Sequence, residues 1–192
     1  MYLINGTLSA SLPFRLHLPD GRTRTSLHEL DDAQRAELDI YPCEEIKPPL
    51  EWTQHHGTPV IEVADGRATA TYPVLDYSSD EVAGILDAAK ESKRSEIASA
   101  RFEAEIAGID GIKTDRESQA LITGAALKAM QDNTYSCRWK TESGFVELSA
   151  LQISAVADAV RAHVQGCFDR EAELLPLIEA AESPEELAAI FY

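Results

Sequence analysis

The residues best suited to chemistry lie in one stretch near the C-terminal end, HVQGCFD at 163–169. His163 and Cys167 stand four residues apart, a spacing that lets two metal ligands share one face of a helix. A zinc site would need two more ligands, and Cys43 and Cys137 could supply them only if two distant segments converged. The first question is therefore whether this stretch is a metal site or part of the core.

The apolar pattern of the same segment favours packing. Steps of three and four residues, or their sum, connect Ile153, Ala157, Val160, Val164, Cys167, Leu174 and Ile178. Cysteine is often buried and packs as a small hydrophobe, so we predict that Cys167 lies inside this stripe, among residues near Ile153 and a neighbouring hairpin. His163 is expected at the rim. The acidic residues Asp169, Glu171 and Glu173 are expected to form a solvated helix face rather than a paired-carboxylate site.

Other candidates for catalysis or ligand binding are weaker. A nucleophilic cysteine needs a cationic setting; Cys137 lies between Arg138 and Lys140, but it alternates with aromatic residues as on the core face of a strand. His55 and His56 are adjacent, and neighbouring side chains of an extended chain point in opposite directions, so we expect solvated loop histidines rather than two ligands of one ion. The segment GIDGIK lacks the spacing of a phosphate-binding loop. We therefore predict no catalytic residue, no cofactor and no metal.

Composition narrows the classes of protein. The 192 residues include 33 acidic and 17 basic side chains, for a net charge of −16 that is spread along the chain and disfavours nucleic-acid binding. The hydrophobic content of 44% is enough for one domain or two small ones. Three cysteines cannot all pair, which indicates reduced thiols and synthesis in the cytoplasm. The first residues do not resemble a signal peptide, and no apolar run is long enough to span a membrane.

Residues 1–77 read as a β-rich N-terminal module. Asn-Gly at 5–6 and Asp-Gly at 65–66 are hairpin signals, and Pro-Asp-Gly at 19–21 indicates a further turn. Asp31 with Gln34 predicts a capped short helix. The range 42–59 contains four prolines, from which we predict an extended connector without regular structure.

Residues 78–108 predict one long linking helix, opened by a capping box of Ser78 and Glu81 and closed by Gly108. Its apolar stripe is thin and rich in alanine, so it is expected to contact a partner or another copy of the chain. The residues assigned to this partner or oligomer interface are Ile85, Leu86, Ile97 and Phe102.

Residues 109–192 predict a helix-hairpin-helix domain. Its helices are opened by Thr114 with Glu117, by Ser149 with Gln152, and by Ser183 before Pro184. Alternating residues from 135 to 148 predict one β-hairpin between the first two helices. The predicted fold class is α+β, with a β-rich N-terminal part, a long central helix and a C-terminal helical domain carrying one β-hairpin.

The run from about 108 to 173 resembles an uncharacterised C-terminal domain of tail-fibre and tail-associated proteins of tailed bacteriophages and prophages. The resemblance depends on TDRESQ at 114–119, on Trp139-Lys140 with GFV at 144–146, and on HVQ and CF within 163–168. The segments TRTSLHELDDAQRAELDIYPCEE and YPVLDYSSDEVAGILDAAKESKRSEIASARFEAE resemble the front end of small phage tail-fibre, tail-assembly and baseplate-associated proteins. That family carries no established active site.

The resemblance implies a non-enzymatic virion component, a tail-fibre or baseplate-associated protein that links or attaches tail parts. It also implies homo-oligomers, other phage tail proteins as partners, and a location in the virion tail after assembly in the host cytoplasm. Neither nucleic acid nor membrane is an expected partner. The alternatives are a tail-fibre assembly chaperone that is absent from the mature particle and, third, a cysteine-dependent hydrolase.

Overall fold

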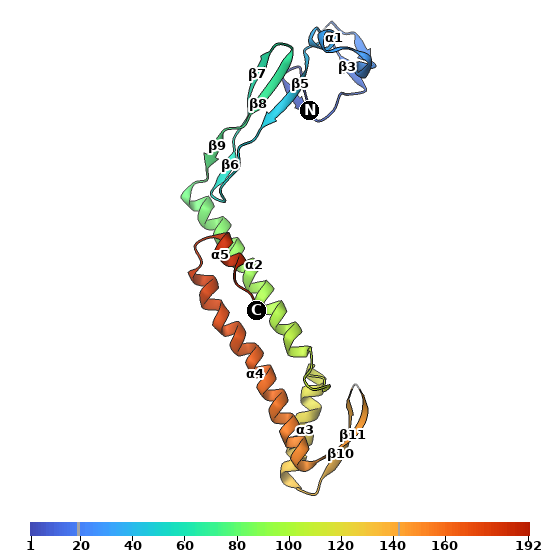
Figure 1. Cartoon of the computed structure of the whole chain (residues 1–192), viewed down its shortest axis with the longest axis vertical. Coiled ribbons are helices and arrows are strands. Elements are labelled where there is room, and N and C mark those ends of the chain that lie inside the picture. Colours follow the sequence, from blue (N-terminus) through green and yellow to red (C-terminus); the bar gives the residue numbers. More distant parts are fainter. Residues whose placement is uncertain (19, 142) are drawn as a thin grey trace. The chain divides into compact units, whose positions relative to one another are not determined.

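The computed structural model describes residues 1–18, 20–141 and 143–192 (Figure 1). These residues divide into two compact units, Met1–Val82 and Ala83–Tyr192. Short strands dominate the N-terminal unit, followed by a long helix and by further helices with one β-hairpin. The predicted α+β class, with this order of parts, is confirmed.

The N-terminal unit is built around a five-stranded sheet in which β5 (Ile40–Ile46) and β8 (Arg67–Thr71) run parallel and the other neighbours run antiparallel. In spatial order its strands are β2 (Thr7–Ser9), β1 (Tyr2–Ile4), β5, β8 and β7 (Val60–Ala64).

Tight turns connect two of the antiparallel pairs of this sheet, β1 with β2 and β7 with β8. Asn5 and Gly6 have φ of 48° and 78°, and Asp65 and Gly66 have φ of 51° and 74°. Positive φ at both central residues defines the turn that matches the twist of a hairpin, and Asn-Gly and Asp-Gly adopt it most readily. Both predicted hairpins are therefore confirmed.

Smaller elements complete this unit: the pairs β3 (Arg15–His17) with β4 (Thr23–Thr25) and β6 (Gln54–His56) with β9 (Val74–Asp76), the 3₁₀ helix η1 (Leu27–Glu29) and helix α1 (Asp32–Ala36). The capping box of Asp31 and Gln34 opens α1 as predicted. The predicted turn at 19–21 includes Pro19, which lies outside the described residues. Leu16, Leu27 and Ile40 form the core between these elements.

The prediction of an irregular connector over 42–59 holds at 47–53 and 57–59 but is wrong for the remaining residues, because β5 includes Pro42 and β6 lies at Gln54–His56. Asn5 N–H donates to Asp39 O and Cys43 N–H donates to Met1 O, so the Tyr2–Pro42 pair between them exchanges no hydrogen bond. Pairing of β5 with β8 begins only at Cys43. Pro42 thus occupies a strand position at which neither neighbour needs its missing N–H.

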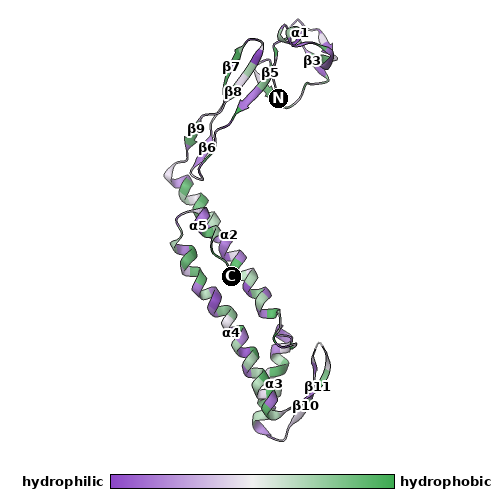
Figure 2. Ribbon diagram, in the orientation of Figure 1, coloured by the Kyte–Doolittle hydropathy of each residue, from purple (hydrophilic) through white to green (hydrophobic). Residues whose placement is uncertain are grey.

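The C-terminal unit contains most of α2 (Ser79–Ile106), together with α3 (Arg116–Gln131), β10 (Ser136–Thr141), β11 (Gly144–Ser149), α4 (Ala150–Ala180) and α5 (Pro184–Ala188). Hydrophobic and hydrophilic residues alternate along α2, α3 and α4 (Figure 2), as helices with one packed face require. Within the described residues, no helix combines the length and apolar character needed to cross a membrane.

Both ends of α2 match the prediction. The Ser78 backbone N–H donates to the Glu81 carboxylate, and the Glu81 backbone N–H donates to Ser78 Oγ, as in a capping box. Gly108 follows the helix with φ 88°, and a Cβ at this position would lie only 2.9 Å from the Ile112 carbonyl oxygen. The chain can therefore turn sharply here because residue 108 is glycine.

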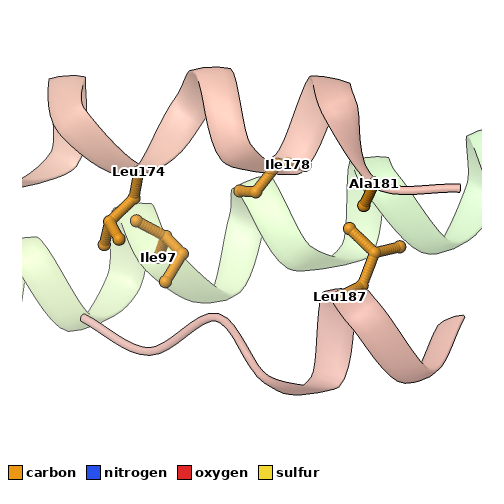
Figure 3. Packing of buried hydrophobic residues seen from close by; sticks show 5 residues of the cluster. All are labelled: Ile97, Leu174, Ile178, Ala181 and Leu187. Carbon is orange, nitrogen blue, oxygen red and sulfur yellow. The ribbon is translucent and has the colours of Figure 1, made fainter. Parts of the chain in front are cut away.

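Helix α2 is part of the C-terminal core rather than a separate linking helix. Ile97 is 1% exposed and packs against Leu174 and Ile178 of α4, with Ala181 and Leu187 completing the cluster (Figure 3). Leu86 packs against the same cluster. The assignment of Ile97 to a partner interface is therefore wrong, because a helix more than 70 residues later in the chain covers its side chain.

Helices α3 and α4 pack at their adjoining ends around Ala129, Ala150 and Ile153, and the hairpin residues Cys137 and Leu148 pack against this cluster. The hairpin β10–β11 and the capping box of Ser149 and Gln152 are present as predicted. Ser183 caps α5 as predicted.

The predicted cap of α3 is one residue too early. Asp115 is the N-cap and accepts from the Ser118 backbone N–H at 2.9 Å. Thr114 is fully buried, and its hydroxyl donates to Glu105 O and accepts from Gly108 N–H. A tertiary contact with the end of α2 therefore occupies the threonine side chain, and the next residue caps the helix.

Candidate functional site

The HVQGCFD stretch belongs to the packed structure of α4. His163 is half-buried, and its Nε2 lies 3.0 Å from the carbonyl oxygen of Ala104. Because a carbonyl can only accept, the imidazole donates to one of the last carbonyls of α2, which have few partners within their own helix. Cys167 is buried, as predicted. The hairpin does not lie beside it, because the hairpin packs near Ile153, which is 14 residues or about 21 Å away along the helix.

The three acidic residues that follow have separate partners. Asp169 accepts from Gln165, Glu171 pairs with Arg101 at 3.1 Å, and Glu173 pairs with Arg170 at 3.5 Å. Among residues 1–18, 20–141 and 143–192, no three His, Cys, Asp or Glu side chains lie close enough together to hold a metal ion.

A buried ion-pair cluster joins α2 to α4. Arg101 bonds Glu105 one turn later on α2 and Glu171 on α4. The side chains are 16%, 7% and 20% exposed, so water screens these charges poorly. The guanidinium also lies 4.5 Å from the centre of the Phe168 ring, a cation–π contact. This cluster was not among the predicted sites, although the i, i+4 spacing of Arg101 and Glu105 is a signal in the sequence.

The Glu105 carboxylate also connects α2 to the start of α3. Gln119 donates through its amide to Glu105 Oε1 at 3.3 Å and to Thr114 O at 2.7 Å. Together with the Thr114 hydroxyl, these bonds fix the turn between α2 and α3. The cluster therefore holds three helices in register, which is a structural role.

Tyr192 packs against the Cys167 segment and donates to the Cys167 carbonyl oxygen at 3.0 Å. Burial, and secondly hydrogen bonding with Cys167, raise the pKa of Tyr192 to about 12. Its unfolded pKa is about 10, so the folded protein keeps the proton to higher pH than the unfolded chain does. This stabilising contribution is complete below pH 10 and is lost as the pH rises from about 10 through about 12.

We therefore expect a pH-dependent difference between the native protein and Tyr192→Phe. At pH 8 the variant should be less stable by about 1 kcal/mol, because it lacks one hydrogen bond. At pH 11 the difference should shrink. Unfolding then lets Tyr192 ionise, which lowers the stability of the unsubstituted protein, whereas the phenylalanine of the variant cannot ionise. Thermal melts at both pH values check this result, and an equal difference at both would contradict it.

The paired histidines of the N-terminal unit contact aromatic rings. His55 stacks on Tyr77 with ring centres 4.7 Å apart, and His56 meets Tyr72 edge-on at 5.8 Å. His56 Nε2 also lies 2.9 Å from the Pro48 carbonyl oxygen. The expectation of solvated loop histidines is therefore wrong: both are half-buried, and His56 fixes the proline-containing segment.

The C-terminal unit carries a hollow of about 750 Å³ between α3 and β10. Leu121 and Phe145 line it and are 61% and 72% exposed. From α3 and the turn before it come Lys113, Asp115, Glu117, Ser118, Ala120, Leu121, Gly124 and Ala125, and from the hairpin and its approach come Tyr135, Cys137, Arg138, Trp139, Lys140 and Phe145. We call this surface the α3–β10 groove. The alternation of Cys137 and Trp139 along the strand predicted a packed face and gave no sign of this groove.

The charges of the groove differ from those of the remaining chain. Residues 113–149 contain five basic and five acidic side chains, so the net charge of −16 lies outside this segment. The backbone N–H and then the hydroxyl of Ser118 donate to Asp115 and hold the pKa of that carboxyl below its usual value. Asp115 is thus engaged in capping α3. Lys113, Arg138 and Lys140 are exposed along the groove.

A model of one protein family, described as a domain of unknown function (DUF4376), matches residues 88–191. The match covers just over half of the chain. The chain belongs to this family. No curated protein and no solved structure matches the chain.

The DUF4376 domain contains both features described above, the cluster around Arg101 and the α3–β10 groove. It also contains Ile97 and Phe102 of the predicted interface, whereas Ile85 and Leu86 precede the match. Phe102 is 43% exposed and Ile85 is half-buried. A partner contact at these two residues stays a prediction.

Proposed function

We propose that the chain is a non-enzymatic structural protein of a tailed-bacteriophage particle, a tail-fibre or baseplate-associated component that links or attaches tail parts. The phage assignment is supported by the sequence resemblance. The binding role is supported by the α3–β10 groove, where Leu121 and Phe145 are exposed beside a preformed hollow. Exposed apolar side chains next to a concavity are typical of sites that bind proteins or ligands. Other tail proteins and further copies of the chain are the proposed partners.

Quantitative mass spectrometry of purified particles tests this proposal. We expect the chain to be present in the virion tail in a fixed ratio to the major tail protein, after synthesis in the host cytoplasm. Its absence from particles, in an infection that produces it in the cell, would overturn the proposal.

A fibre-assembly chaperone is the second candidate. The observation that favours it is the pair of edge strands β2 and β7 in the N-terminal sheet, which could cover an unpaired strand of an immature fibre. Co-expression separates the two functions, because a chaperone would raise the yield of soluble fibre and then be missing from the particle.

A further inference from the structure

We propose that the α3–β10 groove binds one extended segment of another protein, which adds a strand to β10 and alternates apolar with acidic side chains. The inference builds on the proposed function, because it names the chemistry of the partner at the surface proposed for binding. Three features of the molecule support it: the free edge of β10, the two faces of that strand, and one glycine of α3.

The first observation is the free edge of β10. All six residues of β10 pair with β11, and within the described residues these two strands make up the whole sheet. In an antiparallel pair, every second residue directs its N–H and C=O away from the neighbouring strand. These outward groups belong to β10, which lines the groove together with α3. A groove between a helix and a strand edge suits an added strand, whose main chain bonds the edge.

The second observation is the different chemistry of the two faces of β10. Cys137 packs toward α3 and α4, and Trp139 lies on the same face, because alternate residues of a strand share a face. Arg138 and Lys140 lie on the opposite face, which they share with Glu147 and Phe145, their partners on β11. On the outer edge of β10, no strand of the described part of the chain faces the two basic side chains. A strand added at this edge would therefore place every second side chain toward Trp139 and Leu121, and the others beside Arg138 and Lys140. This arrangement selects apolar side chains on one face and carboxylates on the other.

The charges disfavour a second copy of β10 as the added strand. Two copies paired antiparallel about Arg138 would place this residue opposite its own copy, and Lys140 opposite Ser136. Like charges directly opposite are destabilising, and basic side chains on an edge are a common protection against self-pairing. The residues that oppose self-pairing therefore favour an acidic partner.

The third observation is Gly124, which lies in the middle of α3 and lines the groove. A Cβ at this position would meet nothing within 4 Å, so the fold itself does not require glycine. Glycine is unfavourable inside a helix, and it permits another backbone to approach closely. Its position opposite β10 fits an added strand that passes near α3.

The test begins with a yeast-surface library of random ten-residue peptides selected against the full-length chain. We expect the enriched peptides to alternate large apolar residues with Asp or Glu. One enriched peptide is then synthesised and its Kd measured by calorimetry at low and high salt, with weaker binding expected at high salt. On binding, hydrogen exchange at the amides of residues 136–141 should slow, which docking through side chains alone would not cause.

Two pairs of variants test the groove. Arg138→Glu with Lys140→Glu should weaken binding at least tenfold and should accept a peptide in which Lys replaces the acidic residues, whereas Arg161→Glu on the exposed surface of α4 should have no effect. Gly124→Leu should weaken binding at least tenfold without lowering the melting temperature. Gly166→Leu is its control, because this helical glycine also has open space around it and lies outside the groove.

The inference is overturned if no peptide is enriched, if enriched peptides lack the alternation, or if amides 136–141 exchange at an unchanged rate. Equal effects of Gly124→Leu and Gly166→Leu would also overturn it. Its failure is distinct from failure of the proposed function: peptide binding by a protein absent from particles supports the groove alone, and a particle component that selects no peptide supports the tail role alone.

Discussion

Replacing Ile178 with alanine should lower the free energy of unfolding of the C-terminal unit by about 2–5 kcal/mol. Ile178 is completely buried, and it packs in the cluster that joins α2, α4 and α5 (Figure 3). The substitution removes buried methyl and methylene groups and leaves a cavity between helices that have little freedom to close it.

Leu177 is the matched control for this prediction. It precedes Ile178 on the same helix but is 54% exposed, so Leu177→Ala should cost less than about 1 kcal/mol. Circular dichroism at 222 nm during urea unfolding follows this unit, because almost all the helix of the chain belongs to it. Equal losses for the two variants would show that the cluster is not the stabilising contact between the helices.

The sequence predicted best those elements whose cause is local. Asn5-Gly6 and Asp65-Gly66 form their turns because the residues themselves tolerate positive φ. The caps at Asp31 and Ser149 form because donor and acceptor lie three residues apart. In each case the residues that decide the structure are neighbours in the chain, so tertiary contacts have little to change.

The predictions that failed depend on partners distant in sequence. Pro42 lies in a strand because β1 meets it at a position without a hydrogen bond. Thr114 bonds the end of α2 and leaves the cap to Asp115. Ile97 looked like part of an unpaired stripe because its cover on α4 begins more than 70 residues later. A helical period shows that a face is apolar, but it does not show which segment covers it.

The candidate site was less predictable than the fold. Alternation correctly placed Cys137 on the packed face of a strand, and it gave no sign that the edge of the same strand borders a groove. The balance of charges in residues 113–149 can be counted in the sequence, but only the fold places Lys113, Arg138 and Lys140 around one hollow. A binding surface made of two elements needs their relative position, which spacing alone does not supply.

Replacing Arg101 with leucine should cost about 3 kcal/mol, because it leaves the Glu105 carboxylate buried without its counter-ion. Arg94 provides a matched control on the same helix. It also pairs with two carboxylates, but its side chain is 33% exposed and those of its partners are 77% and 58% exposed, so Arg94→Leu should cost less than about 1 kcal/mol.

A double-variant cycle separates the charge from the packing of Arg101. Glu105→Gln removes the buried charge but keeps an amide oxygen that can accept from Gln119. Arg101→Leu combined with Glu105→Gln should therefore be more stable than Arg101→Leu alone, as measured by urea unfolding. The contrary outcome is that the losses of stability from the two substitutions simply add. The cost of losing Arg101 would then lie in its contact with the Phe168 ring and its bond to Glu171, and not in the buried charge of Glu105.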